Sequence, residues 1–179
     1  MLKSPHPIVQ LARAAILEYL TRGTLIDPPA VLPPEMDRPA GVFVSLKKDG
    51  RLRGCVGTFE PTTPSIAREV IHNAVNAANG DPRFAPVTRE EMARISCSVD
   101  VLTPMEPVSS PGDLDPKRYG VLIQQDELRG LLLPDLDGVE TVAQQLDIAA
   151  RKAGIALGSP SDPSVKIFRF EVKRYQEQD

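Results

Sequence analysis

Residues 41–60 read GVFVSLKKDGRLRGCVGTFE, and this stretch predicts a β-hairpin from which the rest of the fold can be worked out. Two segments rich in Val, Phe and Leu flank the polar residues 47–50. An Asp-Gly pair between two such segments is a strong signal for a two-residue type I′ turn, because both central residues of that turn need a positive φ. We therefore expect two antiparallel strands joined at Asp49 and Gly50.

A two-residue turn also predicts which residues of the two strands face each other. The expected pairs, counted outward from the turn, are Lys48 with Arg51, Leu46 with Arg53, Val44 with Cys55, and Val42 with Gly57. Directly opposed residues point to the same face of a sheet. Arg53 and Cys55 would then share a face with the apolar residues of the first strand. A slip of one residue would exchange the two faces.

The return strand, residues 52–57, has an unusual composition for a strand. It holds two glycines, one arginine and one of the two cysteines of the chain. Glycine weakens a strand, and its presence indicates close approach of a ligand or of another structural element. Both explanations stay open for Gly54 and Gly57.

Length and charge limit the class of protein. The 179 residues suffice for one domain with a core and room for a smaller lobe, and the hydrophobic content of 41% is typical of globular proteins. The net charge of −3 makes a nucleic-acid partner an unfavoured expectation, although basic residues cluster near the hairpin turn. The chain shows neither a membrane-spanning apolar run nor the apolar core of a signal peptide. We expect a cytoplasmic protein without a membrane partner.

The cysteines and histidines are few and far apart. Cys55 and Cys97 are expected to be free thiols, and together with His6 and His72 they show no zinc-type spacing. Residues 54–57 lack the lysine and the length of a phosphate-binding loop. The sequence therefore predicts no metal site and no cofactor.

The rest of the chain alternates helices with further strands. Helical spacing predicts helices over residues 7–22, from a cap at Thr62 or Thr63 to Gly80, and over 139–153. Strand patterns predict a strand at 95–102, a second hairpin at 119–134 and, after a loop at 159–163, a last strand at 165–172. Because the strands come mainly as hairpins, we expect an α+β fold, a largely antiparallel sheet with about three main helices.

The two predicted hairpins share a short sequence. Leu52-Arg53-Gly54 and Leu128-Arg129-Gly130 each open a return strand. Three residues match too easily by chance to establish an internal duplication.

Five motifs occur in an order and at spacings that resemble the AMMECR1 domain family. They are Gly41-Val-Phe-Val-Ser-Leu, Leu52-Arg-Gly-Cys-Val-Gly-Thr, Asp81-Pro-Arg-Phe-Ala-Pro, Val99-Asp-Val-Leu-Thr-Pro and Gly130-Leu-Leu-Leu-Pro. The chain departs from the family's usual pattern at Asn79-Gly80, where an aromatic residue is common, and at Asp135, where Gln or a similar polar residue is frequent.

The resemblance covers nearly the whole chain, from about residue 8 to residue 175. It implies a single AMMECR1-like domain over residues 1–179 with a two-lobed α+β fold. The family has no established biochemical activity. Its prokaryotic members often accompany a radical-SAM protein and a Memo-like protein, so the resemblance implies these two as partners in a modification pathway.

The candidate site is built around Cys55. Its thiol is either an inert core group or a nucleophile, helped by neighbouring Arg53, with His72 as the candidate base. Arg53 and Arg83 either pair with protein groups or hold an anionic ligand, which Gly54 and Gly57 would allow to approach. The adjacent acids at positions 90 and 91 are expected to form a solvated helix start.

Two functions remain open from the sequence. One is an enzyme, or an accessory subunit of a modification system, with a small-molecule or anionic ligand around residues 52–57. The alternative is a non-catalytic protein-binding module in which this strand is structural. The residues alone do not decide whether the protein is an enzyme.

Overall fold

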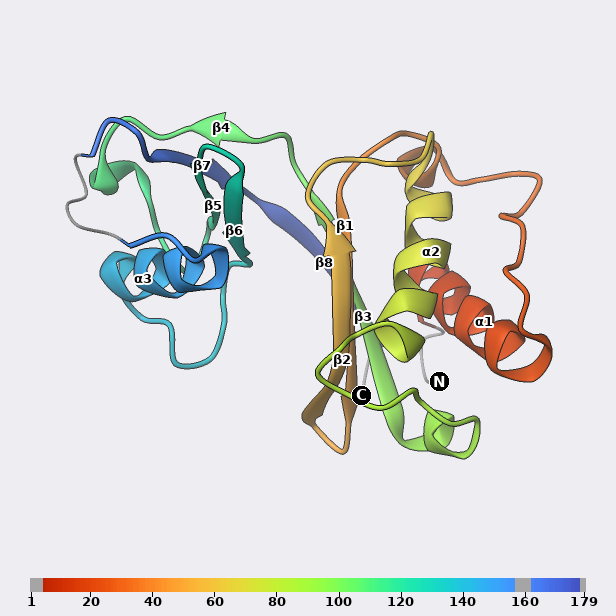
Figure 1. Cartoon of the computed structure of the whole chain (residues 1–179). Coiled ribbons are helices and arrows are strands. Elements are labelled where there is room, and N and C mark those ends of the chain that lie inside the picture. The colour runs from red at the N-terminus through yellow and green to blue at the C-terminus, as the bar shows by residue number, and fades with distance from the viewer. Residues whose placement is uncertain (1–4, 157–161, 178–179) are drawn as a thin grey trace. The chain divides into compact units, whose positions relative to one another are not determined.

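The computed structural model describes residues 5–156 and 162–177, so most of the loop expected at 159–163 lies outside the described residues. The chain divides into two compact units, residues 1–102 with 173–179, and residues 103–172. The described residues form three α-helices and two four-stranded sheets (Figure 1). The predicted α+β fold is therefore confirmed.

The first unit is a sheet covered by two helices on one face. Its strands, in the order β2-β1-β3-β8, are β2 (Arg51–Thr58), β1 (Val42–Lys48), β3 (Ile95–Leu102) and β8 (Val172–Gln176). Helices α1 (Pro7–Arg22) and α2 (Ile66–Asn79) pack against each other and against the strands (Figure 1). Two short 3₁₀ helices, η1 (Pro34–Met36) and η2 (Glu90–Arg94), lie in the connections.

Alternation along β1 explains why only one face of this sheet joins the core. Val42, Val44 and Leu46 are fully buried, whereas Phe43 and Ser45 between them are half-buried. Successive side chains of a strand point to opposite faces, so the buried set faces the helices. We call the opposite face, which carries Phe43 and Ser45, the helix-free face.

Helix α2 starts later than the sequence predicted. Its N-cap is Ser65, whose hydroxyl accepts from the Arg68 amide, so the predicted cap at Thr62 or Thr63 is wrong. These two threonines instead donate their hydroxyls to the buried carboxylate of Glu69, at 2.9 and 2.7 Å. A buried carboxylate needs such donors, and this need overrides the local capping preference of threonine.

The second unit pairs an antiparallel sheet with a single helix. Its strands, in the order β4-β7-β5-β6, are β4 (Glu106–Pro107), β7 (Lys166–Phe170), β5 (Gly120–Gln125) and β6 (Leu128–Leu132), after a 3₁₀ helix η3 (Pro111–Asp113). Helix α3 (Val142–Ala153) packs on β5 and β6 and begins three residues later than predicted, because Thr141 forms its capping box with Gln144. The expected last strand ends at Phe170, and β8 follows as a separate strand. In the described part of the chain, each helix is too short or too polar to cross a lipid bilayer.

The short sequence shared by the two hairpins has a common structural use. A Cβ added to Gly54 would lie 2.0 Å from the carbonyl oxygen of Ala77 in α2, and one added to Gly130 would lie 2.0 Å from that of Ala149 in α3. In both units the glycine of the return strand thus lets the backbone of a helix touch the sheet.

Gly54→Ala should lower the free energy of unfolding by roughly 2 kcal/mol or more, because helix backbone cannot move aside for a methyl group. Urea unfolding followed by circular dichroism would measure the loss. Gly112→Ala is the matched control, since its new Cβ would meet nothing closer than Ser110 Oγ at 3.5 Å. Equal stability of the two variants would contradict this account of the helix–strand contact.

Candidate functional site

The first hairpin has the predicted turn but not the predicted register. Asp49 and Gly50 have φ values of 51° and 78°, and Lys48 pairs with Arg51, so the two-residue type I′ turn is confirmed. A β-bulge follows, because Lys47 pairs with Leu52 and Leu46 with Gly54. Arg53 is the extra residue of the bulge.

The bulge exchanges the two faces of β2 beyond it. Ser45 is opposite Cys55 and Val44 is opposite Val56, so the predicted pairing of Val44 with Cys55 is wrong. Cys55 consequently lies on the helix-free face, where its Sγ is 3.2 Å from Ser45 Oγ. In the unbulged register this thiol would have pointed into the core beneath the helices. Re-aiming a side chain is a recognised effect of β-bulges near functional sites.

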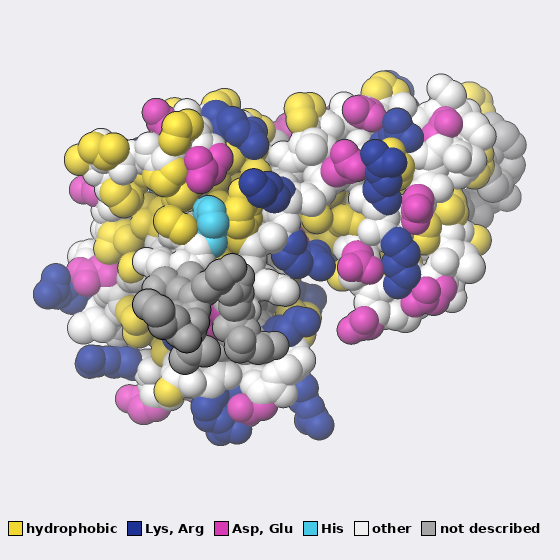
Figure 2. Space-filling view, turned by 180° about the vertical axis from the view of Figure 1, so that it is seen from behind, with side chains coloured by type: hydrophobic (Ala, Val, Ile, Leu, Met, Phe, Trp, Pro, Cys, Tyr) yellow, Lys and Arg dark blue, Asp and Glu magenta, His cyan; other side chains and the backbone are white. Residues whose placement is uncertain are grey.

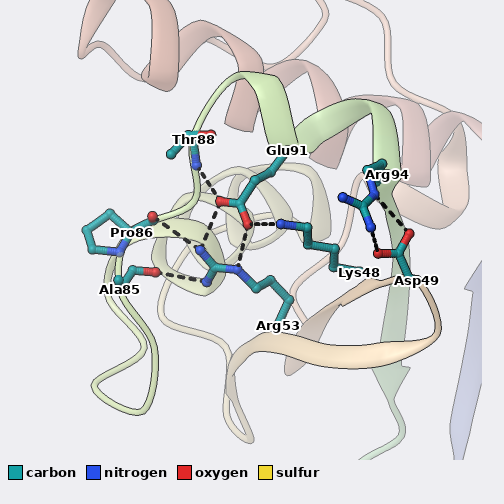
Figure 3. Close-up of polar contacts among 8 residues, drawn as sticks. All are labelled: Lys48, Asp49, Arg53, Ala85, Pro86, Thr88, Glu91 and Arg94. Atoms are coloured by element: carbon teal, nitrogen blue, oxygen red, sulfur yellow. Dashed lines mark hydrogen bonds and ion pairs between the residues drawn. The ribbon is translucent and has the colours of Figure 1, made fainter.

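Arg53, the bulge residue, is held by a carboxylate and two carbonyl groups. Its Nε and Nη2 donate to Glu91 Oε1 and Oε2 at 3.1 and 3.0 Å (Figure 3). Nη1 and Nη2 also donate to the carbonyl oxygens of Ala85 and Pro86, at 2.8 and 3.2 Å. The side chain is only 16% exposed. The structure therefore places Arg53 in a structural ion pair.

Glu91 is the partner that the sequence did not reveal. Besides Arg53, it accepts from Lys48 Nζ at 2.7 Å and from the amide of Thr88 at 2.9 Å (Figure 3). These donors, Arg53 first, lower the pKa of Glu91 from 4.5 to about 2. The prediction of a solvated helix start is thus wrong for Glu91. Its three-residue spacing from Thr88 pointed to a cap, but nothing local pointed to Arg53, 38 residues earlier.

Asp81 and Arg83 together hold the main chain of Cys55. The Cys55 amide donates to Asp81 Oδ2 at 2.9 Å, and Arg83 Nη2 donates to the Cys55 carbonyl oxygen at 3.3 Å. Arg83 also donates to both oxygens of Asp81, at 2.9 and 2.7 Å, and these bonds hold the pKa of Asp81 well below its usual range. Because β2 is an edge strand, this side-chain pair takes the place of a neighbouring strand.

The space beside the two candidate glycines is filled by protein groups. Helix α2 contacts Gly54, as described above. A Cβ on Gly57 would lie 2.2 Å from the ring of Phe43, so that ring covers the glycine on the helix-free face. Phe43 thus forms an apolar wall on the same face as Cys55.

The structure does not bring His72 to Cys55. His72 lies on the exposed side of α2, and α2 covers the face of the sheet opposite the thiol. The group that does reach the thiol is Ser45, whose cross-strand neighbour on the other side is Ser98 in β3. One row further along this face, Phe43 pairs with Asp100, a buried carboxylate that accepts from Arg174 at 2.7 and 3.0 Å.

The two cysteines occupy different environments, and both are free thiols as predicted. Cys97 is buried in the core, and burial raises the pKa of its thiol to about 12. Cys55 is half-buried beside a hydroxyl group on the helix-free face. Within residues 5–156 and 162–177, no three His, Cys, Asp or Glu side chains are grouped closely enough to hold a metal ion.

These features define an α+β protein with two units built from hairpins and helices, and with one cysteine fixed at the edge of a sheet. A family model described as AMMECR1 matches residues 9–175. The chain therefore belongs to the AMMECR1 family, and the resemblance drawn from its motifs is confirmed.

Relatives extend over nearly the whole chain. A protein of Thermotoga maritima is 49% identical over 173 residues, which is 96% of this chain and 98% of that protein. Protein CA_C1420 of Clostridium acetobutylicum is 47% identical over 174 residues, but the match spans only 36% of its length. The crystal structure of an uncharacterized protein from Pyrococcus horikoshii aligns with a TM-score of 0.90 and 34% identity, over 96% of this chain and 90% of that one. None of these names states an activity.

Glu91→Gln should destabilise the protein by about 1–3 kcal/mol at pH 7, because Arg53 and Lys48 lose their carboxylate. A folded-state pKa below the unfolded value gives stability that is present above about pH 5 and lost as the pH falls toward 2. The variant should therefore lose less stability than the wild type between pH 5 and pH 2. Urea unfolding at a series of pH values measures both effects.

The exposed Glu60 supplies the control for this experiment. Glu60→Gln should leave the stability at pH 7 close to that of the wild type. A Glu91→Gln variant with the wild-type pH dependence would show that the ion pair with Arg53 contributes little.

Proposed function

We propose that the protein carries out a thiol-dependent reaction at Cys55, as an enzyme or as an accessory subunit of a modification system acting on a small molecule. The observation that carries this proposal is the bulge at Arg53. It turns Cys55 out of the core and onto the helix-free face, and Glu91 secures it there. A cysteine used only as a small apolar core group would be buried, as Cys97 is.

The surroundings of Cys55 suit a positioned nucleophile. Asp81 and Arg83 fix both backbone groups of the residue, so the Cα–Cβ bond has a set direction. Ser45 places a hydroxyl 3.2 Å from the sulfur, where it can donate to a thiolate. Such preorganisation lowers the entropy cost of bringing a substrate to the reacting atom.

The chemistry that this site supports is nucleophilic substitution or addition by sulfur. The Cys55 thiol gives its proton to water, and the thiolate forms a bond to an electrophilic carbon of the substrate. In a substitution, the leaving group departs with the electron pair of the broken bond. In this scheme Arg53 holds the bulge and does not touch the substrate.

A nucleic-acid substrate receives no support from the face of the molecule shown in Figure 2. On this face, basic and acidic side chains are mixed. Binding to phosphates would need a continuous basic stripe.

Iodoacetamide should alkylate Cys55 in the native protein and leave Cys97 unmodified, because Cys97 is 2% exposed. Timed quenching followed by peptide mass spectrometry gives the rate at each residue. Cys55→Ser should abolish native labelling, whereas Cys97→Ser should preserve it. The proposal fails if Cys55 reacts only after denaturation.

A non-catalytic binding module is the second candidate. One observation favours it: Gly54 and Gly57 of the 52–57 strand are occupied by packing contacts, and Arg53 by its ion pair. The helix-free face would then dock another protein, and a radical-SAM protein and a Memo-like protein are the proposed partners.

Cys55→Ser separates the two candidates. A reacting thiol predicts a variant whose stability changes by about 1 kcal/mol or less and which fails to replace the wild-type gene in the native organism. A binding module predicts that the same variant is functional in the cell. It should also bind a purified radical-SAM or Memo-like protein as tightly as the wild type, by isothermal titration calorimetry.

A further inference from the structure

Arg53 and Arg83, the two arginines near Cys55, differ in how many hydrogen-bond donors remain free for a ligand. Each nitrogen of Arg53 donates to Glu91 or to a carbonyl group, and its side chain is 16% exposed. Arg83 is 55% exposed and uses Nε and Nη2 for its protein contacts. Among the described residues, none accepts a hydrogen bond from Arg83 Nη1. The guanidinium of Arg83 therefore presents free donors to solvent.

Arg83 is also held in a fixed position next to Cys55. Two of its nitrogens bond the buried carboxylate of Asp81, and its guanidinium carbon lies 5.5 Å from the centre of the Phe84 ring. Its Nη2 reaches the Cys55 carbonyl oxygen. The pKa of Arg83 is raised, first by the hydrogen bonds to Asp81, and the charge of a Cys55 thiolate is one of the smaller causes. The thiol thus lies within electrostatic reach of this guanidinium.

We propose that Arg83 recognises an anionic group on the molecule that reacts with Cys55, so that the substrate is a small electrophile bearing a carboxylate or a phosphate. This inference rests on the proposed function, since it names the substrate class of the same site. Arginine donates directed hydrogen bonds to oxyanions, and here Asp81 binds it from the buried side and leaves the exposed edge available. Phe43 offers an apolar wall on the helix-free face for the uncharged part of such a molecule.

A pair of alkylating reagents that differ in charge tests this inference. Iodoacetate and iodoacetamide both form a sulfur–carbon bond with the thiolate while iodide leaves with its electron pair, and the thiol proton goes to water. Only iodoacetate carries a carboxylate. The measured quantity is the ratio of the two rate constants at Cys55, divided by the same ratio for glutathione.

The wild-type ratio should exceed that of glutathione by roughly three- to fivefold, the factor that a partly exposed ion pair provides. Arg83→Gln should bring the ratio close to that of glutathione. Loss of the backbone contact to Cys55 affects both reagents alike, so it cancels in the ratio. Arg51→Gln is the matched control, because Arg51 is an exposed cation on the same strand and should leave the ratio unchanged.

A second measurement needs no variant and therefore does not depend on the folding of Arg83→Gln. Sodium acetate and inorganic phosphate should each slow the iodoacetate reaction of the wild type more than sodium chloride does at equal ionic strength. Slowing by phosphate alone would indicate a phosphate-bearing substrate, and slowing by acetate alone would indicate a carboxylate.

The outcomes separate this inference from the proposed function. If iodoacetamide labels native Cys55 but the ratio equals that of glutathione, and neither acetate nor phosphate exceeds sodium chloride, the role of Arg83 is overturned and the thiol site stands. If neither reagent labels native Cys55, both proposals are overturned together.

Discussion

The β-bulge at Arg53, where an ion pair with Glu91 holds the extra residue, sets which way Cys55 points. Each residue beyond a bulge lies on the face opposite to the one that it would occupy in the unbulged register. A half-buried guanidinium needs a partner. Glu91, in a segment that follows α2, accepts from Arg53 with both carboxylate oxygens. The position of the thiol therefore depends on a contact between chain segments that are distant in the sequence.

The contacts around Cys55 come from three separate stretches of the chain. Strand β1 provides Ser45, the loop after α2 provides Asp81 and Arg83, and η2 provides Glu91. Ser45 contacts the sulfur, and Asp81 and Arg83 hold the backbone groups. Glu91 bonds Arg53 and acts on Cys55 only through the register of the strand. The 52–57 strand and its contacts thus fix the position of the Cys55 side chain.

The fold class and the family could be predicted because their signals are local or span the whole chain. The Asp49-Gly50 turn requires only two adjacent residues, and the helix patterns need only a few turns of sequence. The bulge could not be predicted, since Arg53 meets its partner 38 residues away. His72 was a candidate base because the chain has only two histidines. In the structure it faces solvent on α2, which covers the face of the sheet opposite Cys55. The sequence left open whether Arg83 pairs with protein groups or holds an anion, and only the structure showed that Asp81 and Arg83 together hold the main chain of Cys55.

The pair formed by Asp81 and Arg83 has a further effect, on how the protein behaves among other copies of itself. An edge strand presents unpaired backbone groups, to which a strand of another molecule can bind. The side chains of this pair occupy those groups at Cys55, on the outer edge of β2. A foreign strand would have to displace a salt bridge before it could extend the sheet at this point. The contact that positions the thiol therefore also protects the chain against edge-to-edge aggregation.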